Sequence, residues 1–353
     1  MNSTASSTAA GTTAAAGNLQ LEYLSSRSVA SQPASWWHSV LGIVGFEKPP
    51  AIDRGGVPVT ASMTPSLSAI DLCEVWRVAG SQVRLSSGES SQSRVRYRFS
   101  EDLLFGTLTI AERAIDARSE AGALLRATEI AYQEIFDVLN EAGHQHLIRI
   151  WNYLPEINAQ AGGDERYRHF NSARQMAFRK SGRATMGAVP AASALGSPAG
   201  SPISIYFLAG RRPPKMIENP RQTSAYHYPP KFGRHSPIFS RACVWGESGS
   251  SKLFVSGTAS IVGHETIHRG DVVAQTREII VNISALLDEA NRVVGAPRYS
   301  LEALKLKVYV RKPADLAAIE ATLSGLLRAT TGIVYLQADV CREDLLVEIE
   351  AVG

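Results

Sequence analysis

A glutamate near the carboxyl end of the chain has the surroundings that acid–base chemistry requires. Glu348 stands in the largely apolar segment 345–351, whose composition predicts a β-strand. A carboxyl on such a strand is partly removed from water, which raises its pKa towards neutrality and suits it to act as a general acid. Glu350 is expected to point to the same side, because side chains alternate along a strand. The alternative is that one of these glutamates faces solvent or forms a structural ion pair.

A cysteine lies shortly before this glutamate. Cys341 precedes a charged turn made of Arg342, Glu343 and Asp344. Its thiol is a weak hydrogen-bond donor and acceptor, so it could move a proton or bias which bond of a substrate opens. The alternative is a half-buried thiol that only packs as a small apolar group, as most free cysteines do.

Strands and helices alternate around these two residues. A helix is predicted where apolar residues recur at helical spacing over 271–290, with Asp271 as its N-cap. The other predicted elements of this half are a strand at 253–261, a strand at 304–310, a helix at about 314–328 and strands at 334–337 and 345–351. This order predicts an α+β fold, a mixed sheet with helices packed on one face.

The first half of the chain repeats the same order. The segment FGTLTI at 105–110 parallels SGTASI at 256–261, and the predicted helix at 124–143 parallels that at 271–290. The matching strand is 146–153, and a helix at 163–179 and a strand at 202–208 complete the copy. Residues 181–204 are rich in Ala, Gly and Ser and are expected to form a loop. Two copies of one α+β unit are therefore predicted.

Net charge and apolar runs narrow the classes of partner. Lys and Arg number 36 and Asp and Glu 33, so the net charge is +3. So small an excess is not typical of nucleic-acid binding, whereas a small anionic substrate remains compatible with it. No apolar run reaches the length of about 18 residues that a membrane span needs, so no membrane partner is expected.

The cysteines and histidines indicate the compartment and the absence of a metal. Cys73, Cys243 and Cys341 form an odd, widely spaced set, which is a poor disulfide framework and favours a reducing compartment, here taken as the cytoplasm. His264 and His268 have the spacing of two ligands on a helix, but they lie in a turn region and no third ligand is evident. No metal is therefore expected.

The second half resembles the RidA (YjgF-type) family, which has a chorismate-mutase-like fold. The resemblance rests on VSGTASI at 255–261, GDVVAQTREIIVNISALL at 270–287 and LLVEIEAV at 345–352. The imine deaminases of that family carry a carboxylate-binding arginine at the position that Ile333 occupies here. The chain lacks this arginine, so imine hydrolysis is not expected.

The chain over about 20–353 is similar to the chorismatases, which have two RidA-like halves. Between the halves this resemblance rests on RYRHFNSAR at 166–174 and YPPKFGRHSPIFSRA at 228–242. It implies a degenerate RidA-like N-terminal domain at 18–210, a Pro-rich connecting loop at 211–240 and a RidA-like C-terminal domain at 241–353. Residues 1–17 are small, polar and uncharged and are expected to form a disordered tail. The active site is then expected between the halves, and a duplication within one chain is compatible with a monomer.

The resemblance also implies a reaction and a set of site residues. Glu348 would be the general acid and base, and Cys341 and Gly257 match the subtype that forms hydroxybenzoate. The substrate chorismate would be bound by Arg174, Arg241, Tyr153 and Tyr228, although each tyrosine could equally be an ordinary buried one. The expected products are pyruvate and 3-hydroxybenzoate, with 4-hydroxybenzoate as a further product, and no cofactor is needed. The alternatives are a chorismate hydrolase that releases a dihydrodiol and a RidA-like binder of metabolites without catalysis.

Overall fold

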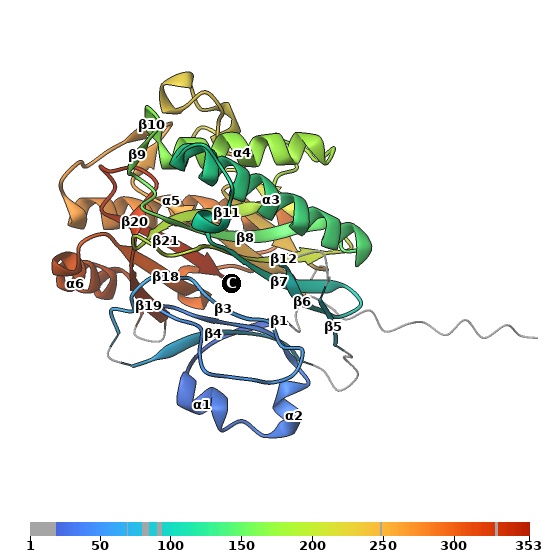
Figure 1. The fold of residues 1–353 in the computed structure, drawn as a ribbon. Coiled ribbons are helices and arrows are strands. Elements are labelled where there is room, and N and C mark those ends of the chain that lie inside the picture. The colour runs from blue at the N-terminus through green and yellow to red at the C-terminus, as the bar shows by residue number, and fades with distance from the viewer. Residues whose placement is uncertain (1–18, 69, 80–84, 90–93, 248, 329–330) are drawn as a thin grey trace, which may run out of the picture.

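Two large sheets face each other and carry helices on their outer sides (Figure 1). The computed structural model describes residues 19–68, 70–79, 85–89, 94–247, 249–328 and 331–353. The predicted tail at 1–17 lies outside these ranges. No helix in the described ranges combines the length and the apolar character that crossing a membrane demands.

The first large sheet has seven strands in the order β20-β11-β8-β12-β7-β6-β5. Helices α3 and α4 cover one face of it, and their apolar side chains share a core with that face. In chain order its elements are β5 (Ser86–Glu89), β6 (Arg96–Phe99), β7 (Leu103–Ile110), η2 (Glu112–Ala114), α3 (Glu120–Glu141), β8 (His146–Pro155), β9 (Gln160–Ala161), β10 (Asp164–Glu165), α4 (Arg166–Lys180), β11 (Ala191–Ser197) and β12 (Ile203–Gly210).

The second large sheet has six strands in the order β13-β14-β15-β21-β18-β19, and helices α5 and α6 cover its outer face. Its elements are β13 (Lys215–Ile217), η3 (Ala225–His227), η4 (Pro230–Phe232), β14 (Ala242–Trp245), β15 (Lys252–Thr258), β16 (Ile261–Val262), β17 (Glu265–Thr266), α5 (Val272–Val294), η5 (Leu301–Ala303), β18 (Lys305–Val310), η6 (Pro313–Asp315), α6 (Leu316–Leu326), β19 (Gly332–Gln337), β20 (Asp339–Val340) and β21 (Val347–Val352).

The predicted internal repeat is confirmed by the strand order. Six strands of the first sheet, β11-β8-β12-β7-β6-β5, correspond one by one to β19-β18-β21-β15-β14-β13 of the second. In both sheets the only parallel pair among these is the first, β8 with β11 and β18 with β19, and the other neighbours are antiparallel. The predicted fold class, an α+β fold with two tandem units and helices on one face of each mixed sheet, therefore holds.

One short strand crosses from the second half to the first. β20 pairs with β11 through Leu195 opposite Val340 and Gly196 opposite Asp339. A Cβ on Gly196 would lie 2.6 Å from the Cβ of Asp339, so the two backbones approach more closely than a side chain at 196 would permit. This pairing fixes Cys341, the next residue along the chain, against the first half.

The expected loop at 181–204 is wrong in its middle, where residues 191–197 form β11. Its composition is poor in strand formers, but strand propensity depends mainly on how side chains fit their neighbours. Small residues are needed here because β11 lies against β15: the amide of Ala192 donates to Oγ of Ser256 at 2.9 Å. Tertiary contact at close range outweighs local propensity in this segment.

Residues 19–78 form a further sheet that the repeat does not account for. Its strands are β1 (Leu19–Ser25), β2 (Val40–Gly45), β3 (Val59–Ala61) and β4 (Leu72–Val78), in the order β1-β4-β2-β3, with the short helices α1 (Ser26–Ala30) and α2 (Ala34–Trp37). Apolar side chains of this sheet, including Leu21, Val44 and Trp76, join the core between the two large sheets. The range 18–210 thus contains two sheets, and β13 ties part of the Pro-rich segment 211–240 to the second large sheet.

The N-cap of α5 gives a direct test of this folding analysis. Oδ1 of Asp271 accepts a hydrogen bond from the amide of Ala274 at 2.9 Å. Asp271→Ala removes this bond and is expected to lower the free energy of unfolding by about 1 kcal/mol in urea denaturation. Asp288→Ala, on the exposed side of the same helix, is the control and should cost less. Equal losses in the two variants would contradict the assigned cap.

Candidate active site

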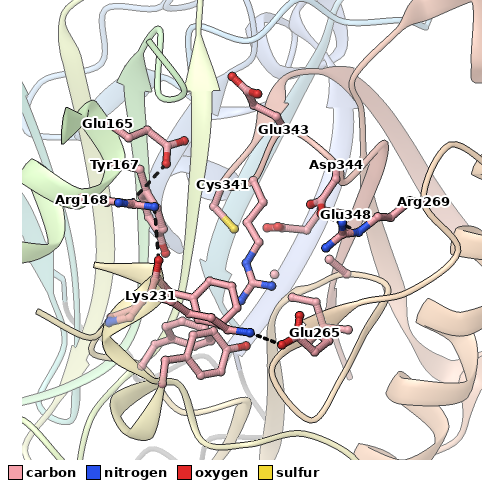
Figure 2. A pocket seen from close by; sticks show the side chains of 18 of the residues that line it. Glu165, Tyr167, Arg168, Lys231, Glu265, Arg269, Cys341, Glu343, Asp344 and Glu348 are labelled. Atoms are coloured by element: carbon pink, nitrogen blue, oxygen red, sulfur yellow. Dashed lines mark hydrogen bonds and ion pairs between the residues drawn. The ribbon is translucent and has the colours of Figure 1, made fainter. Parts of the chain in front are cut away.

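A cavity of about 520 Å³ lies where the two halves meet, at the end of β15 and the start of β21. The first half contributes residues from the β9–β10 hairpin and the start of α4. The Pro-rich segment, the β16–β17 hairpin, Arg269 and the charged turn at 342–344 also border the cavity (Figure 2). The lining residues include Tyr167, Tyr228, Lys231, Phe232, Phe239, Arg241, Gly257, Ala259, Glu265, Cys341, Arg342, Glu343 and Glu348. The structure thus brings together five of the seven predicted site residues.

A small recess of about 30 Å³ continues the cavity inward, and it holds a sixth predicted residue. Arg174 on α4 lines this recess together with Glu348, Cys341 and Gly257, which also line the main cavity. The recess therefore joins the arginine predicted from the first half to the acid and the thiol from the second.

The carboxyl of Glu348 is buried and has no polar partner. Its residue is 4% exposed, and no described residue forms a hydrogen bond or an ion pair with its carboxyl. Burial raises the pKa of Glu348 to about 8, and the negative charge of Glu350 acts in the same direction against the cations Arg149, Arg311 and Arg241. A carboxyl in this state is protonated at neutral pH and can give up its proton, as a general acid must.

Gly257 provides the space that this carboxyl occupies. A Cβ at position 257 would lie 2.7 Å from Cδ of Glu348 and would collide with Oε1. The side chain of Glu348 fills the space that a side chain at position 257 would take.

The segment that carries Cys341 is held by one arginine. The guanidinium of Arg311 donates to the carbonyls of Val340 and Arg342 at 2.9 and 2.8 Å and to Oδ1 of Asp339 at 2.6 Å. Cys341 itself is half-buried and borders both the cavity and the recess. Burial and the charge of Glu348 raise the pKa of its thiol to about 12, so the group beside Glu348 is a neutral thiol and not a thiolate nucleophile.

Three arginines present unpaired N–H groups to this region. Nη2 of Arg241 donates to the carbonyl of Thr223 at 2.7 Å and to the Tyr228 hydroxyl at 2.8 Å, while its buried Nε has no partner among the described residues. Nε and Nη2 of Arg174 are also buried and have no hydrogen-bond partner among the described residues. Unpaired guanidinium donors of this kind suit bidentate binding of a carboxylate.

The third arginine, Arg342, was placed in the charged turn by the sequence but was not predicted to face the site. Its guanidinium lies 4.0 Å from the ring centroid of Phe232 and 5.2 Å from that of Tyr228. Nη1 donates to the carbonyl of His264 at 2.9 Å, and the buried Nη2 has no partner among the described residues. Its position next to Cys341 was the available signal, but the stacking that turns it inward comes from a distant segment.

The two predicted tyrosines lie in different places in the structure. Tyr228 lines the cavity, and because its hydroxyl accepts from Arg241, its own proton remains available to donate. The prediction for Tyr153 is wrong in its placement: the residue is fully buried between the sheets, with its hydroxyl 2.7 Å from that of Tyr309 and 3.4 Å from that of Tyr206. It lines neither the cavity nor the recess.

No cluster of three or more His, Cys, Asp or Glu residues that could hold a metal ion occurs within the described ranges. The inner end of the cavity combines a neutral acid and a neutral thiol with arginines that keep unpaired N–H groups. The rim carries both charges, and there Lys231 pairs with Glu265 and Arg269 with Asp344. The set at the inner end is typical of an enzyme that binds an organic anion and transfers a proton to it.

Comparison with known proteins agrees with this class. Residues 74–209 match the family model described as chorismatase FkbO/Hyg5-like, N-terminal. The chain is 40% identical to a 3-hydroxybenzoate synthase of Streptomyces hygroscopicus over 65% of this chain and 70% of that protein, and 35% identical to a chorismatase of Streptomyces rapamycinicus over 84% and 86%. A chorismatase crystal structure aligns over 95% of this chain and 98% of its own with a TM-score of 0.81 and 30% identity. The chain belongs to the chorismatase family, and it is an enzyme.

The raised pKa of Glu348 predicts how stability depends on pH. The folded pKa of about 8 lies above that of a free glutamate, so the folded state binds the proton more tightly, and this contribution is lost as the pH rises through about 8. Glu348→Gln removes the ionisation. As the pH is raised from about 6 to about 9, the Tm of the wild type should therefore fall by several degrees relative to the Tm of Glu348→Gln.

The matched control is Glu343→Gln, because Glu343 is an exposed glutamate on the rim. Its Tm should run parallel to that of the wild type over the same range. Parallel curves for Glu348→Gln as well would show that Glu348 titrates normally and contradict the account.

Proposed function

We propose that this protein is a chorismatase that converts chorismate into 3-hydroxybenzoate and pyruvate. The observation that carries the proposal is the buried, partnerless carboxyl of Glu348 at the inner end of a cavity that contains unpaired arginine donors. Chorismate is a dianion with a vinyl ether, so its site must hold two carboxylates and deliver one proton. The relatives named 3-hydroxybenzoate synthase and chorismatase support this choice of substrate.

The substrate would bind with its two carboxylates on opposite sides of the acid. Arg174 reaches the recess from the first half, whereas Arg241 and Arg342 border the main cavity. The free proton of the Tyr228 hydroxyl offers a further hydrogen bond beside Arg241. Binding of both carboxylates would orient the vinyl ether towards Glu348. This orientation lowers the reaction barrier, because the entropic cost of bringing the acid and the ether together is already met by binding.

Glu348 gives its proton to the enol methylene or to the bridging oxygen of the vinyl ether, and the bond between that oxygen and the ring carbon breaks. The neighbouring ring hydroxyl attacks this carbon as the three-carbon group leaves, and the proton lost by the hydroxyl restores the acid. The leaving group is pyruvate if the methylene took the proton, and enolpyruvate, which becomes pyruvate, if the oxygen took it. Opening of the resulting arene-oxide-like intermediate makes the ring aromatic. All atoms of chorismate are recovered in hydroxybenzoate and pyruvate, so neither water nor a cofactor is consumed.

Cys341 would steer the outcome. As a neutral thiol that borders the same recess as Glu348, it can pass a proton or bias which carbon–oxygen bond of the intermediate opens. Opening at the other carbon gives 4-hydroxybenzoate, which we include as a minor product. Capture of the intermediate by water instead gives the dihydrodiol of a chorismate hydrolase.

Two further proposals concern the state of the protein. Both halves of one chain supply walls of the cavity, so the site is complete in a monomer. The three cysteines are unpaired, which supports work in a reducing compartment such as the cytoplasm.

The test is a product assay with purified protein and chorismate. Pyruvate is measured by a coupled enzyme assay and ring products by chromatography. The amount of pyruvate should equal the sum of the hydroxybenzoates, with 3-hydroxybenzoate as the main product. A dihydrodiol as the main product would make the protein a chorismate hydrolase. Pyruvate release no faster than the spontaneous decay would favour a metabolite binder without catalysis.

The steering role of Cys341 predicts a change of product. Cys341→Ala should raise the share of dihydrodiol, while pyruvate release falls by less than about 100-fold, the lower range for loss of a proton-transferring group. Cys73→Ala is the control, because Cys73 lies in the N-terminal sheet outside the cavity. An unchanged product ratio in Cys341→Ala would limit the thiol to packing.

Gly257→Ala tests whether the position of the carboxyl matters. The new methyl group must displace the Glu348 side chain, which is the flexible end of the contact, so the protein should remain folded. We expect a changed ratio of hydroxybenzoate to dihydrodiol in the chromatographic assay. Ala259→Gly, which alters another small residue of the cavity wall, should leave the ratio as in the wild type. A wild-type ratio in Gly257→Ala would show that the reaction tolerates the displaced carboxyl.

A further inference from the structure

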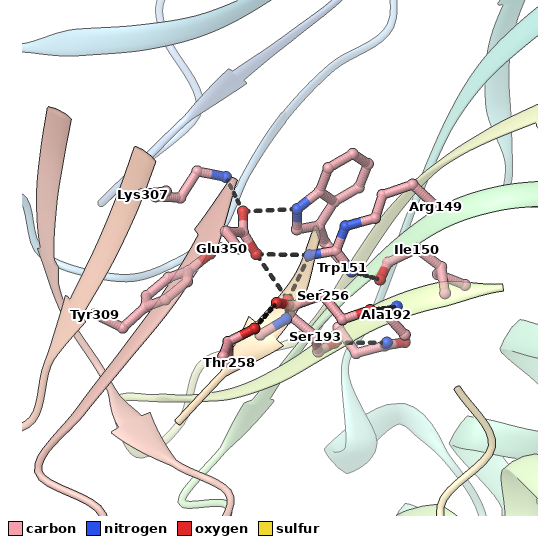
Figure 3. A network of polar contacts seen from close by, with 12 residues as sticks. Arg149, Ile150, Trp151, Ala192, Ser193, Ser256, Thr258, Lys307, Tyr309 and Glu350 are labelled. Carbon is pink, nitrogen blue, oxygen red and sulfur yellow. Dashed lines mark hydrogen bonds and ion pairs between the residues drawn. The ribbon is translucent and has the colours of Figure 1, made fainter. Parts of the chain in front are cut away.

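A buried network of four charged side chains lies between the three sheets, and Figure 3 shows three of them, Arg149, Lys307 and Glu350. Its members are Glu74 on β4, Arg149 on β8, Lys307 on β18 and Glu350 on β21, each at most 4% exposed. The network contains two cations and two anions, so it is neutral as a unit.

Glu350 receives nearly all of the donors in this network. Nη2 of Arg149 and Oγ of Ser193 donate to its Oε2 at 2.8 and 2.7 Å. Nζ of Lys307 and the indole N–H of Trp151 lie 2.8 and 2.7 Å from its Oε1. Although burial opposes ionisation, Lys307 and Arg149 lower the pKa of Glu350 below its ordinary value.

Glu348 lies two residues away on the same face of β21 and receives none of these donors. Oγ of Ser193 separates the two carboxyls: it donates to Glu350 and accepts from Arg149 and from the amide of Gly257. With its donor proton already given to Glu350, Ser193 has none left for Glu348. Two carboxyls on one strand thus have opposite surroundings, which is the arrangement that separates an acid from a permanent anion.

We propose that Glu350 is a positioning residue that binds Arg149 and Lys307 and thereby keeps the carboxyl of Glu348 protonated and free to face the cavity. The inference rests on the proposed function for the role of that proton. Without the negative charge at 350 the network would carry an excess positive charge. Ionisation of Glu348 is then the nearest way to balance it.

Other charged and titratable groups also face Glu348, and their influence has to be kept constant. Arg311 lies beyond β18, Arg241 precedes β14, Tyr167 and Arg174 face it from α4, and the Cys341 thiol follows β20. Tyr23, Tyr153, Tyr206 and Tyr309 surround the network itself. None of these residues is altered in the variants below.

The experiment compares pH–rate profiles of pyruvate release from chorismate. In the wild type, activity should fall as the pH rises and Glu348 loses its proton. Glu350→Gln should move this alkaline limb to lower pH by about 1 unit. If Glu350 has only a structural role, Glu350→Gln should lower the folded fraction or kcat and leave the alkaline limb at the pH of the wild type. An unshifted limb in a folded Glu350→Gln variant overturns the inference.

Glu74→Gln is the matched control, since it removes the same charge from the same lysine. Glu74 contacts Lys307, Tyr206 and Trp76. It makes no hydrogen bond or ion pair with Arg149 or Ser193, which bind Glu350. The alkaline limb of Glu74→Gln should move by clearly less than the alkaline limb of Glu350→Gln. Equal shifts would mean that only the net charge of the network matters and would overturn the role assigned to Glu350.

A second pair of variants, both containing Lys307→Met, tests the inference if Glu350→Gln alone does not fold. Lys307→Met and the double variant Lys307→Met/Glu350→Gln differ only in the charge at position 350. Of the network, the double variant retains one cation, Arg149, and one anion, Glu74, which do not contact each other. The alkaline limb should again lie lower in the variant without Glu350. An identical limb in the two proteins overturns the inference.

A measurement without substrate separates this inference from the proposed function. In protein labelled with carbon-13 at glutamate carboxyls, the Glu348 signal is assigned by its loss in Glu348→Gln, and its pH titration is followed by NMR. A lower titration point in Glu350→Gln supports the positioning role even if chorismate is not the substrate. If the wild type releases pyruvate but the two titrations coincide, the inference fails and the proposed function stands.

Discussion

The site depends on one electrostatic constraint: a carboxyl must stay neutral in a buried position next to a carboxyl that must stay charged. Glu348 has no polar partner in the part of the chain that the structure describes, whereas Glu350, two residues along the same strand, is bound by Arg149, Lys307, Trp151 and Ser193. Burial of a charge without a partner costs several kcal/mol, so each group takes the protonation state that its surroundings favour. The neutral state of Glu348 is the state that the proposed acid requires, and in the proposed reaction the arginines of the cavity would hold the anionic substrate beside it.

This constraint explains why three sheets are needed to build one site. Glu350 and Glu348 come from the second repeat, Arg149 and Ser193 from the first, and Glu74 from the N-terminal sheet that lies outside the repeat. A single α+β unit would leave the inner face of its sheet open to water, and hydrated charges would no longer control the pKa of Glu348. The N-terminal sheet therefore contributes to the chemistry through the core it closes, although within the described residues it supplies no side chain to the cavity.

The sequence predicted the repeated order of elements because each helix and most strands carry a clear periodic pattern, as in 271–290 and 304–310. It missed β11, whose small residues fit only because β15 and β20 approach closely. Glu348, Cys341, Gly257, Arg174, Arg241 and Tyr228 border the predicted site, since local composition and the family resemblance both pointed to them. Tyr153 and Arg342 were misjudged because strand register and long-range stacking decide which way they face. A pattern of residue types along the chain does not contain that information.

The most direct test of the central claim is to observe the proton on Glu348. Infrared difference spectra between the wild type and Glu348→Gln, recorded without substrate, isolate the carbonyl stretching band of this one carboxyl. The account predicts a protonated-carboxyl band at neutral pH that is replaced by carboxylate bands as the pH rises through about 8. A difference spectrum that shows only carboxylate bands at neutral pH would contradict it, because a glutamate already ionised there cannot serve as the acid.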